Sequence, residues 1–143
     1  MLSRGDVLVK SREGRPEGAA SAHEPDTRRL RRYHILRRKR EFDRVFSEGR
    51  TFRFPEMVVR AAPNGLPWSR LGLMVGRRHG SAVRRNRMKR LLREAFRLNR
   101  GLLRIPCDVV LVPNSGWQTL TLSAIEPVVR RAFEGIRKAL GDG

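Results

Sequence analysis

The segment from Ser81 to Leu98 constrains the fold more than any other part of the chain, because its apolar residues separate from its charges only if it is helical. At about 100° per residue, one side of that helix carries Met88, Leu91, Leu92, Ala95, Phe96 and Leu98. The other side carries Asn86, Lys89, Arg90, Arg93 and Arg97, with Glu94 as the nearby counter-charge. Ser81 is a residue type that favours the N-cap of a helix. The sequence therefore predicts an amphipathic helix with one side on a core and a cationic side facing outward.

The cationic side of this helix is unfavourable unless an anion meets it. Like charges four residues apart, such as Lys89 and Arg93, destabilise a helix by roughly 0.2–0.5 kcal/mol per pair. The whole chain is similarly unbalanced, because its 143 residues include 32 Lys and Arg but only 14 Asp and Glu, a formal net charge of +18. Such self-repulsion indicates a polyanionic partner. Nucleic acid is favoured over a membrane, because no apolar run approaches the about 20 residues of a spanning helix and no long helix has the two faces of a membrane-surface helix.

Hydrophobic spacing and turn residues predict the other elements. A first helix is expected over Arg38–Glu48, because Phe42, Val45 and Phe46 share one face and Gly49 follows. Strands are expected at Thr51–Phe54, Met57–Ala62, Leu71–Val75 and Val109–Val112, and a last helix at Ser123–Leu140. The turn at residues 63–67 favours an antiparallel hairpin or meander of the flanking strands. The order α-β-β-β-α-β-α predicts an α+β sandwich, with a small mixed sheet and helices packed on it.

The chain length suits a single domain, which we place at residues 33–143. Residues 1–32 are expected to be a disordered basic extension, because Ser11–Asp26 has almost no periodic apolar residues. The extension ends in Arg28, Arg29, Arg31 and Arg32, which either contact RNA or form a solvated tail. Cys107 is the single cysteine, so no internal disulfide is expected. That cysteine and the lack of an apolar secretory signal in Met1–Lys10 favour a reduced, cytoplasmic location.

No catalytic residue and no metal site on the protein is expected. Acid–base or metal chemistry needs paired carboxylates or His clusters. The carboxylates and histidines lie on separate predicted elements without ligand spacing, although folding can bring distant ones together: Asp43, Glu56, Asp108, Glu126, His23, His34 and His79. The chain is therefore expected to be inactive as a catalyst on its own.

The central segment Gly80–Arg97 resembles the signature helix of the bacterial ribonuclease P protein family, which has Arg-Asn-Arg (here 85–87) followed by Lys-Arg and Arg-Glu. The resemblance extends over Tyr33–Leu140. It implies a left-handed crossover in the fold. It also implies that the chain joins a catalytic RNA to remove the 5′ leader of precursor tRNA, with the catalytic Mg²⁺ on the RNA. No membrane and no obligatory protein partner are expected.

Two surfaces follow from this resemblance. The RNA-subunit surface should comprise Arg77, Arg78, Arg85, Asn86, Arg87, Lys89, Arg90 and Arg93, and Asn86 can both donate and accept at a base edge or a 2′-hydroxyl. A cleft between the first helix and the sheet should hold the single-stranded leader, with Phe42 and Phe46 stacking on bases. Arg60 replaces a frequent aromatic residue there and could contact a phosphate. Alternatively, the two phenylalanines simply belong to the core.

Two other classes of protein share some of these features. A ribosomal-protein-like RNA binder would have the same charge and size but would lack the Arg85–Glu94 signature together with Phe42 and Phe46. A helix-turn-helix DNA-binding protein would need a helix immediately before Ser81. Leu71–Val75 predicts a strand in that region, which argues against this class.

Overall fold

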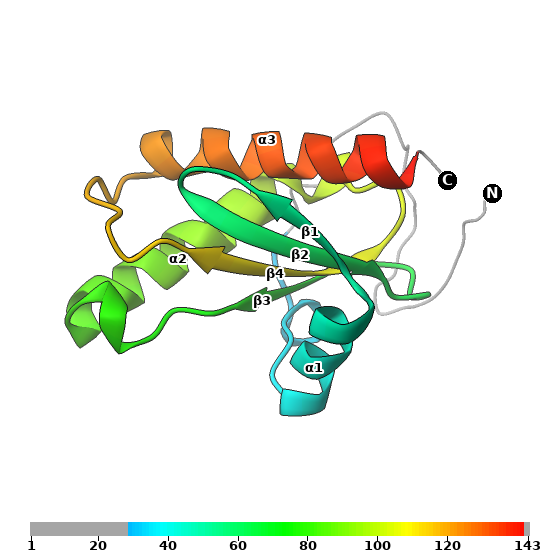
Figure 1. Cartoon of the computed structure of the whole chain (residues 1–143), viewed down its shortest axis with the longest axis horizontal. Helices are drawn as coiled ribbons and strands as arrows, with labels where there is room; N and C mark the ends of the chain where they lie inside the picture. Colours follow the sequence, from blue (N-terminus) through cyan, green and yellow to red (C-terminus); the bar gives the residue numbers. More distant parts are fainter. Residues whose placement is uncertain (1–28, 142–143) are drawn as a thin grey trace.

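The computed structural model describes residues 29–141, so the expectations about residues 1–28 lie outside the described part. The principal elements are α1 (Lys39–Glu48), β1 (Arg50–Arg53), β2 (Met57–Pro63), β3 (Arg70–Leu73), α2 (Ala82–Asn99), β4 (Cys107–Pro113) and α3 (Leu122–Leu140) (Figure 1). Short 3-10 helices form at Arg32–His34 (η2), Arg77–His79 (η3) and Arg100–Leu102 (η4). The predicted element order is confirmed, with bounds that differ by one or two residues. Folded structure reaches slightly into the predicted extension, since Leu30 packs against the core.

The sheet has the strand order β1-β2-β4-β3. Strand β2 is antiparallel to β1 and β4, whereas β3 is parallel to β4, so the predicted mixed sheet is confirmed. The predicted hairpin or meander through residues 57–75 is wrong, because β4 lies between β2 and β3. Strand β4 carries the most continuous apolar run and is almost entirely buried. A strand with a continuous apolar run is stabilised most in the middle of a sheet, where other strands pair with both edges and side chains pack on both faces.

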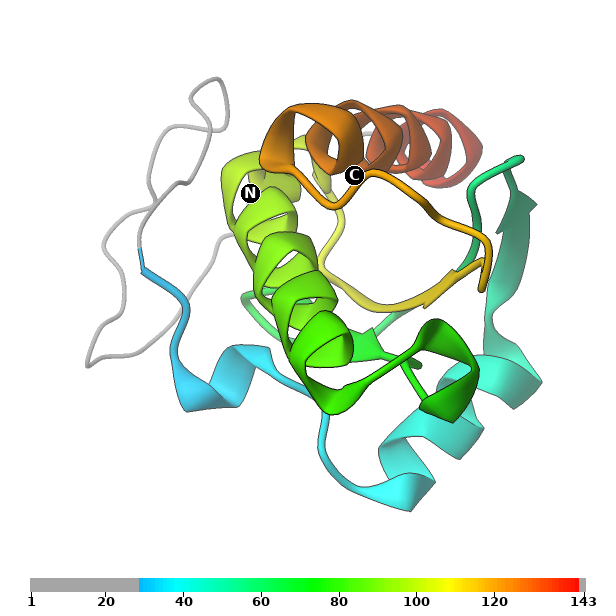
Figure 2. The same ribbon diagram turned by 90° about the vertical axis from the view of Figure 1, so that its left-hand side faces the viewer.

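Helices cover the two faces of the sheet unequally. Helices α2 and α3 pack on one face of the sheet (Figures 1 and 2). There the rings of Phe96 and Phe133 meet edge to face, with centroids 5.8 Å apart. Helix α1 packs on part of the opposite face through Val45, against Leu36 and Val110. Successive residues of β4 therefore point into different clusters, as the two-residue period of a strand requires. Among the elements of residues 29–141, α1 is the α-helix that packs on this face.

Helix α2 has the orientation that its sequence predicts. Met88, Leu92, Ala95 and Phe96 are buried, and the Ser81 hydroxyl accepts a hydrogen bond from the backbone N–H of Arg84 at 3.2 Å. The buried His79 fixes the chain just before the helix. Its Nδ1 accepts from the backbone N–H of Gly76 at 3.0 Å, so Nε2 carries the proton and donates to the carbonyl of Pro113 at 2.8 Å. The start of α2 is thereby tied to the end of β4. The left-handed sense of the β3–α2–β4 crossover stays a prediction.

Candidate nucleic-acid interface

The eight residues predicted to form the RNA-subunit surface all lie on η3 and α2; we call them the α2 patch. Arg77, Arg78, Asn86, Arg87, Arg90 and Arg93 are exposed, and Arg85 and Lys89 are half-buried. The patch has this form because the apolar side of α2 is buried against the sheet and α3. The helix therefore presents a row of cations with an amide among them, as the sequence predicted.

Members of the α2 patch differ in how the protein holds them. Within residues 29–141, six members have side chains that make no hydrogen bond or ion pair: Arg77, Arg78, Asn86, Lys89, Arg90 and Arg93. In contrast, Arg87 donates from Nε to the carbonyl of Leu120 at 2.9 Å, and Arg85 donates from Nε to the carbonyl of Gly80 at 3.1 Å. These two bonds orient their guanidinium groups. The uncommitted side chains have their polar atoms available for a ligand.

Arg84 has a structural role that the sequence did not reveal. Its guanidinium donates to the carbonyl of His79 at 3.1 Å and to the carbonyl of Trp117. Together with Arg87, it fastens the loop between β4 and α3 to the first turns of α2. Each carbonyl lies 33 residues along the chain from the arginine that binds it. The sequence alone therefore could not identify these partners.

The residues of the predicted leader cleft also lie together, between α1 and the sheet. Phe42 is half-buried and packs against the cluster of Leu36, Val45 and Val110, whereas Phe46 is 37% exposed. Gly72 provides the space for Phe42, because a Cβ atom there would lie 2.7 Å from the Phe42 ring. Phe42 therefore serves largely as a core residue, which is the alternative to base stacking given above. Phe46 presents the more accessible ring.

Arg60 lies beside Phe46, with its guanidinium carbon 5.4 Å from the centre of the ring. It donates from Nη1 to the Thr51 hydroxyl at 2.8 Å and from Nη2 to the carbonyl of Phe46 at 2.6 Å. The first bond connects β2 to β1, and the second connects β2 to α1. The stacked arginine keeps the Phe46 ring in place and adds a positive charge at the edge of the cleft.

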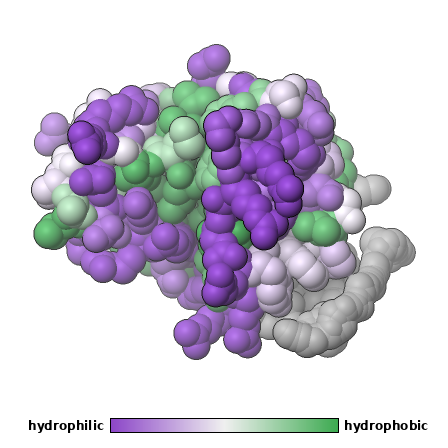
Figure 3. Space-filling view, turned by 90° about the horizontal axis from the view of Figure 1, so that it is seen from below, coloured by the Kyte–Doolittle hydropathy of each residue, from purple (hydrophilic) through white to green (hydrophobic). Residues whose placement is uncertain are grey.

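An apolar strip that the sequence analysis missed continues this cleft across the sheet. Val58 and Val112 are half-buried and occupy paired positions on β2 and β4, and Met74 is 43% exposed just after β3. Figure 3, viewed from the α1 side, shows hydrophobic surface between two hydrophilic regions. The strand alternation could have indicated Val58 and Val112, but only after the β2–β4 pairing was known.

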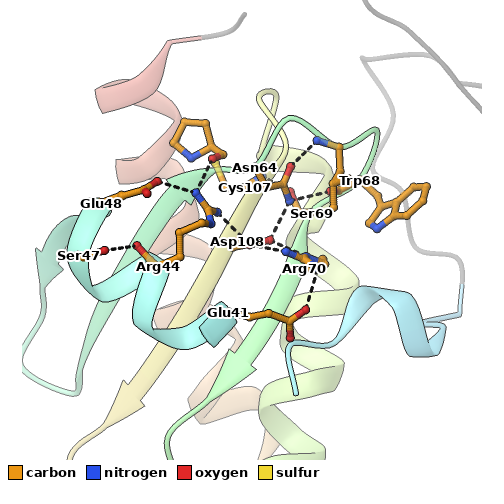
Figure 4. A network of polar contacts seen from close by, with 12 residues as sticks. Glu41, Arg44, Ser47, Glu48, Asn64, Trp68, Ser69, Arg70, Cys107 and Asp108 are labelled. Atoms are coloured by element: carbon orange, nitrogen blue, oxygen red, sulfur yellow. Dashed lines mark hydrogen bonds and ion pairs between the residues drawn. The ribbon is translucent and has the colours of Figure 1, made fainter. Parts of the chain in front are cut away.

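A buried ionic network links α1 to the sheet, next to the predicted cleft (Figure 4). Asp108, fully buried on β4, accepts from Arg70 Nε at 2.8 Å and Nη2 at 2.7 Å, and from Arg44 Nη2 on α1 at 3.0 Å. Arg70 also donates to Glu41 of α1 at 3.2 Å. Burial disfavours the charged form of Asp108, but hydrogen bonds from Arg70, Asn64 and Arg44 outweigh it and hold the pKa of the carboxyl below its usual value.

The Cys107 thiol is buried and unreactive, and the described residues form no metal site. Burial raises the pKa of the Cys107 thiol to about 12, so the thiolate that reacts or binds metals is scarce at neutral pH. Across residues 29–141, no group of three or more His, Cys, Asp or Glu side chains could hold a metal ion. In the same part of the chain, no helix combines the length and the apolar character needed to cross a membrane.

The fold and these surfaces define a small, strongly basic α+β protein with a cationic helix on one side of its sheet and an apolar strip beside α1 on the other. Comparison with known families supports a specific assignment. The ribonuclease P family model matches residues 30–137. The chain belongs to the ribonuclease P protein family, and so to the proteins of tRNA processing. This membership excludes the ribosomal-protein-like and helix-turn-helix alternatives.

Individual relatives agree with this assignment. The ribonuclease P protein component of Thermotoga maritima is 43% identical over 87 residues, which cover 61% of this chain and 74% of that protein. The component from Herpetosiphon aurantiacus is 36% identical over 105 residues, covering 73% and 85%. The solved Thermotoga maritima protein aligns with a TM-score of 0.60 at 33% identity, covering 68% of this chain and 96% of that one. The Staphylococcus aureus protein, with a TM-score of 0.58 over 75% and 94% but 21% identity, supports the fold alone.

Proposed function

We propose that the chain is the accessory subunit of ribonuclease P, binding the catalytic RNA through the α2 patch and the 5′ leader of precursor tRNA through the cleft at α1. It assists endonucleolytic removal of the leader to give the mature tRNA 5′ end. The observation that carries this proposal is the row of half-buried Lys89 and exposed Arg90 and Arg93, whose side chains have no internal partner within residues 29–141. Family membership supplies the enzyme to which this surface belongs.

The energetics of α2 support a phosphate-rich partner. Repulsion between Lys89 and Arg93, one turn apart, is uncompensated in the free protein. Phosphates placed along the patch offset that repulsion and release condensed counterions from the RNA. Asn86, exposed among the arginines, adds a group that can donate and accept at a base edge. The helix thus offers both affinity and a point of recognition.

The composition of the cleft supports a single-stranded partner. Base stacking on an aromatic ring is worth roughly 1–3 kcal/mol and tolerates any base sequence, as a variable leader requires. Phe46 offers such a ring, and Arg60 beside it offers charge to the backbone. The apolar strip of Val58, Val112 and Met74 offers a surface that the bases of the leader can contact.

The chemistry of bond cleavage belongs, in this proposal, to the RNA subunit and its Mg²⁺. The protein's buried carboxylate, Asp108, is saturated by two arginines and an asparagine. Its cysteine is held as the neutral thiol by burial. Asp108 lacks the exposure that a metal ligand requires, and Cys107 lacks both the exposure and the ionised form that a nucleophile requires. We place the assembly in the cytoplasm, with no obligatory protein partner.

Reconstitution with a bacterial ribonuclease P RNA at low Mg²⁺ tests this function. Addition of the chain should stimulate cleavage of precursor tRNA at the mature 5′ end, and no stimulation would contradict the proposal. Arg90→Gln should weaken binding to the RNA subunit and lower the slope of log Kd against log salt by about 1. Glu134→Gln, at an exposed position on α3, serves as the control and should leave cleavage unchanged.

A further inference from the structure

The segment of Arg29 and Leu30, just before the predicted domain, contacts the folded part of the chain. Leu30 packs against the main core, so the chain at Arg29 and Leu30 is held beside α2 (Figure 2). Between this arm and the helix lies a shallow hollow that is open to solvent. It is lined by Arg29, Leu30, Arg90, Arg93, Glu94 and Arg97. Two segments about 60 residues apart in sequence therefore line one hollow.

The charges around this hollow favour an anion. Four arginines face one glutamate there. Glu94 and Arg97 pair with each other at 2.6 Å, and the hydrogen bond from Arg97 lowers the pKa of Glu94, so this pair stays ionised and neutral as a unit. Arg29, Arg90 and Arg93 have no partner within residues 29–141. Three arginines without such a partner therefore line one hollow from two segments of the chain, and arginine is well suited to bind phosphate oxygens.

We propose that this arm–helix hollow is a phosphate site for the backbone of the RNA subunit, in which Arg29 closes over a phosphate held by Arg90 and Arg93. The inference rests on the proposed function and adds a second wall to the α2 patch. The RNA subunit is the source of the phosphate rather than the leader, because the hollow lies on the α2 side of the sheet and the leader cleft on the α1 side. Leu30 is the positioning residue, since it anchors the arm to the core.

Binding of the full chain to a bacterial ribonuclease P RNA over a range of salt concentrations tests this site. Arg29→Gln should weaken binding and lower the salt slope by about 0.7–0.9. Between ~50 and ~200 mM salt, the wild-type chain should therefore lose about threefold more affinity than the variant. Lys138→Gln removes one charge from an exposed position that does not line the hollow, and it should leave the slope unchanged.

Two further variants separate a phosphate site from a general loss of charge. Leu30→Ala keeps every charge but removes the anchor, so its slope should fall between those of the wild-type chain and Arg29→Gln. Glu94→Gln removes the carboxylate from the hollow and should tighten binding with a steeper slope. A merely structural role for Glu94 would not tighten binding.

The outcomes distinguish this inference from the proposed function. An unchanged slope for Arg29→Gln, beside a reduced slope for Arg90→Gln, would overturn the arm–helix site and leave the α2 patch intact. Unchanged slopes for both variants would contradict the α2 patch as well. A defect of Arg29→Gln confined to precursor-tRNA binding by the assembled enzyme would overturn the assignment to the RNA subunit. A Leu30→Ala slope equal to that of the wild-type chain would overturn the role of the anchor.

Discussion

Replacing Asp108 with asparagine should destabilise the domain by about 3 kcal/mol. Removing one partner of a buried ion pair costs about 3–5 kcal/mol, because the remaining charge stays buried without compensation. Arg70 and Arg44 keep 21% and 31% of their side-chain surface exposed, and Arg70 retains Glu41, so the lower end of that range applies. Asparagine also turns one acceptor oxygen into an NH₂ donor that must face a guanidinium or amide donor.

Urea unfolding followed by circular dichroism measures this effect. With a denaturant dependence of ~1.5–3 kcal/mol per M, the midpoint should fall on the order of 1–2 M. Asp43→Asn is the matched control: its ion pair with Lys39 is exposed and should contribute little, so the midpoint should not move measurably. If Asp108→Asn behaved like Asp43→Asn, the network would not anchor α1 and the reasoning about the cleft would be refuted.

The acid limb of the stability curve gives an independent check of the same network. The pKa of Asp108 is lowered in the folded state, so its contribution is fully present above the unfolded value of about 3.9. The contribution is lost as the pH falls through the lower, folded-state pKa. The free energy of unfolding of Asp108→Asn should therefore vary less with pH below about 4 than that of the wild-type chain. Equal pH dependence in the two chains would count against the ionised form of the buried carboxyl.

Three other predictions follow from the geometry of the cleft and the core. Phe46→Ala should weaken binding of leader-bearing tRNA to the assembled enzyme, with little effect on mature tRNA or on stability, because the Phe46 ring is 37% exposed; equal losses for both tRNAs would argue against stacking on the leader. Gly72→Ala should lower the free energy of unfolding by about 1–3 kcal/mol, since its Cβ would lie 2.7 Å from the Phe42 ring, and an unchanged urea midpoint would contradict that close contact. Cys107, with its pKa raised to about 12, should resist thiol reagents in the folded chain and react on unfolding, and rapid labelling of the native protein would contradict its burial.

Helix α2 was predictable from the sequence because all the information for it is local. Residues three and four apart decide which side is apolar, and Ser81 marks the start within the same segment. The strand partners were not predictable in this way. The turn at residues 63–67 is present, but β2 pairs with β4, whose sequence lies more than 40 residues away, and no local signal states that partner.

The Asp108 network shows the same limit for side chains. The sequence shows Asp108 only as an isolated carboxylate, whereas its partners Arg44 and Arg70 are 64 and 38 residues distant. The resemblance of residues 40–46 and 85–97 to a known family located the two candidate surfaces. It did not indicate that Arg84 and Arg87 bind backbone carbonyls, because those contacts depend on where the β4–α3 loop lies.

The connection between the two surfaces bears directly on the proposed function. If the RNA subunit carries the catalytic centre and the protein holds the leader, the α2 patch and the cleft must share an edge. Met74, at the end of the apolar strip, precedes Arg77 and Arg78 by only three and four residues, and η3 joins that strand end to α2. His79 fixes this junction through Pro113 of β4, the strand that also carries Val112. A leader lying along the strip toward Met74 therefore meets the first arginines of the α2 patch, which brings the substrate to the edge of the RNA-binding surface.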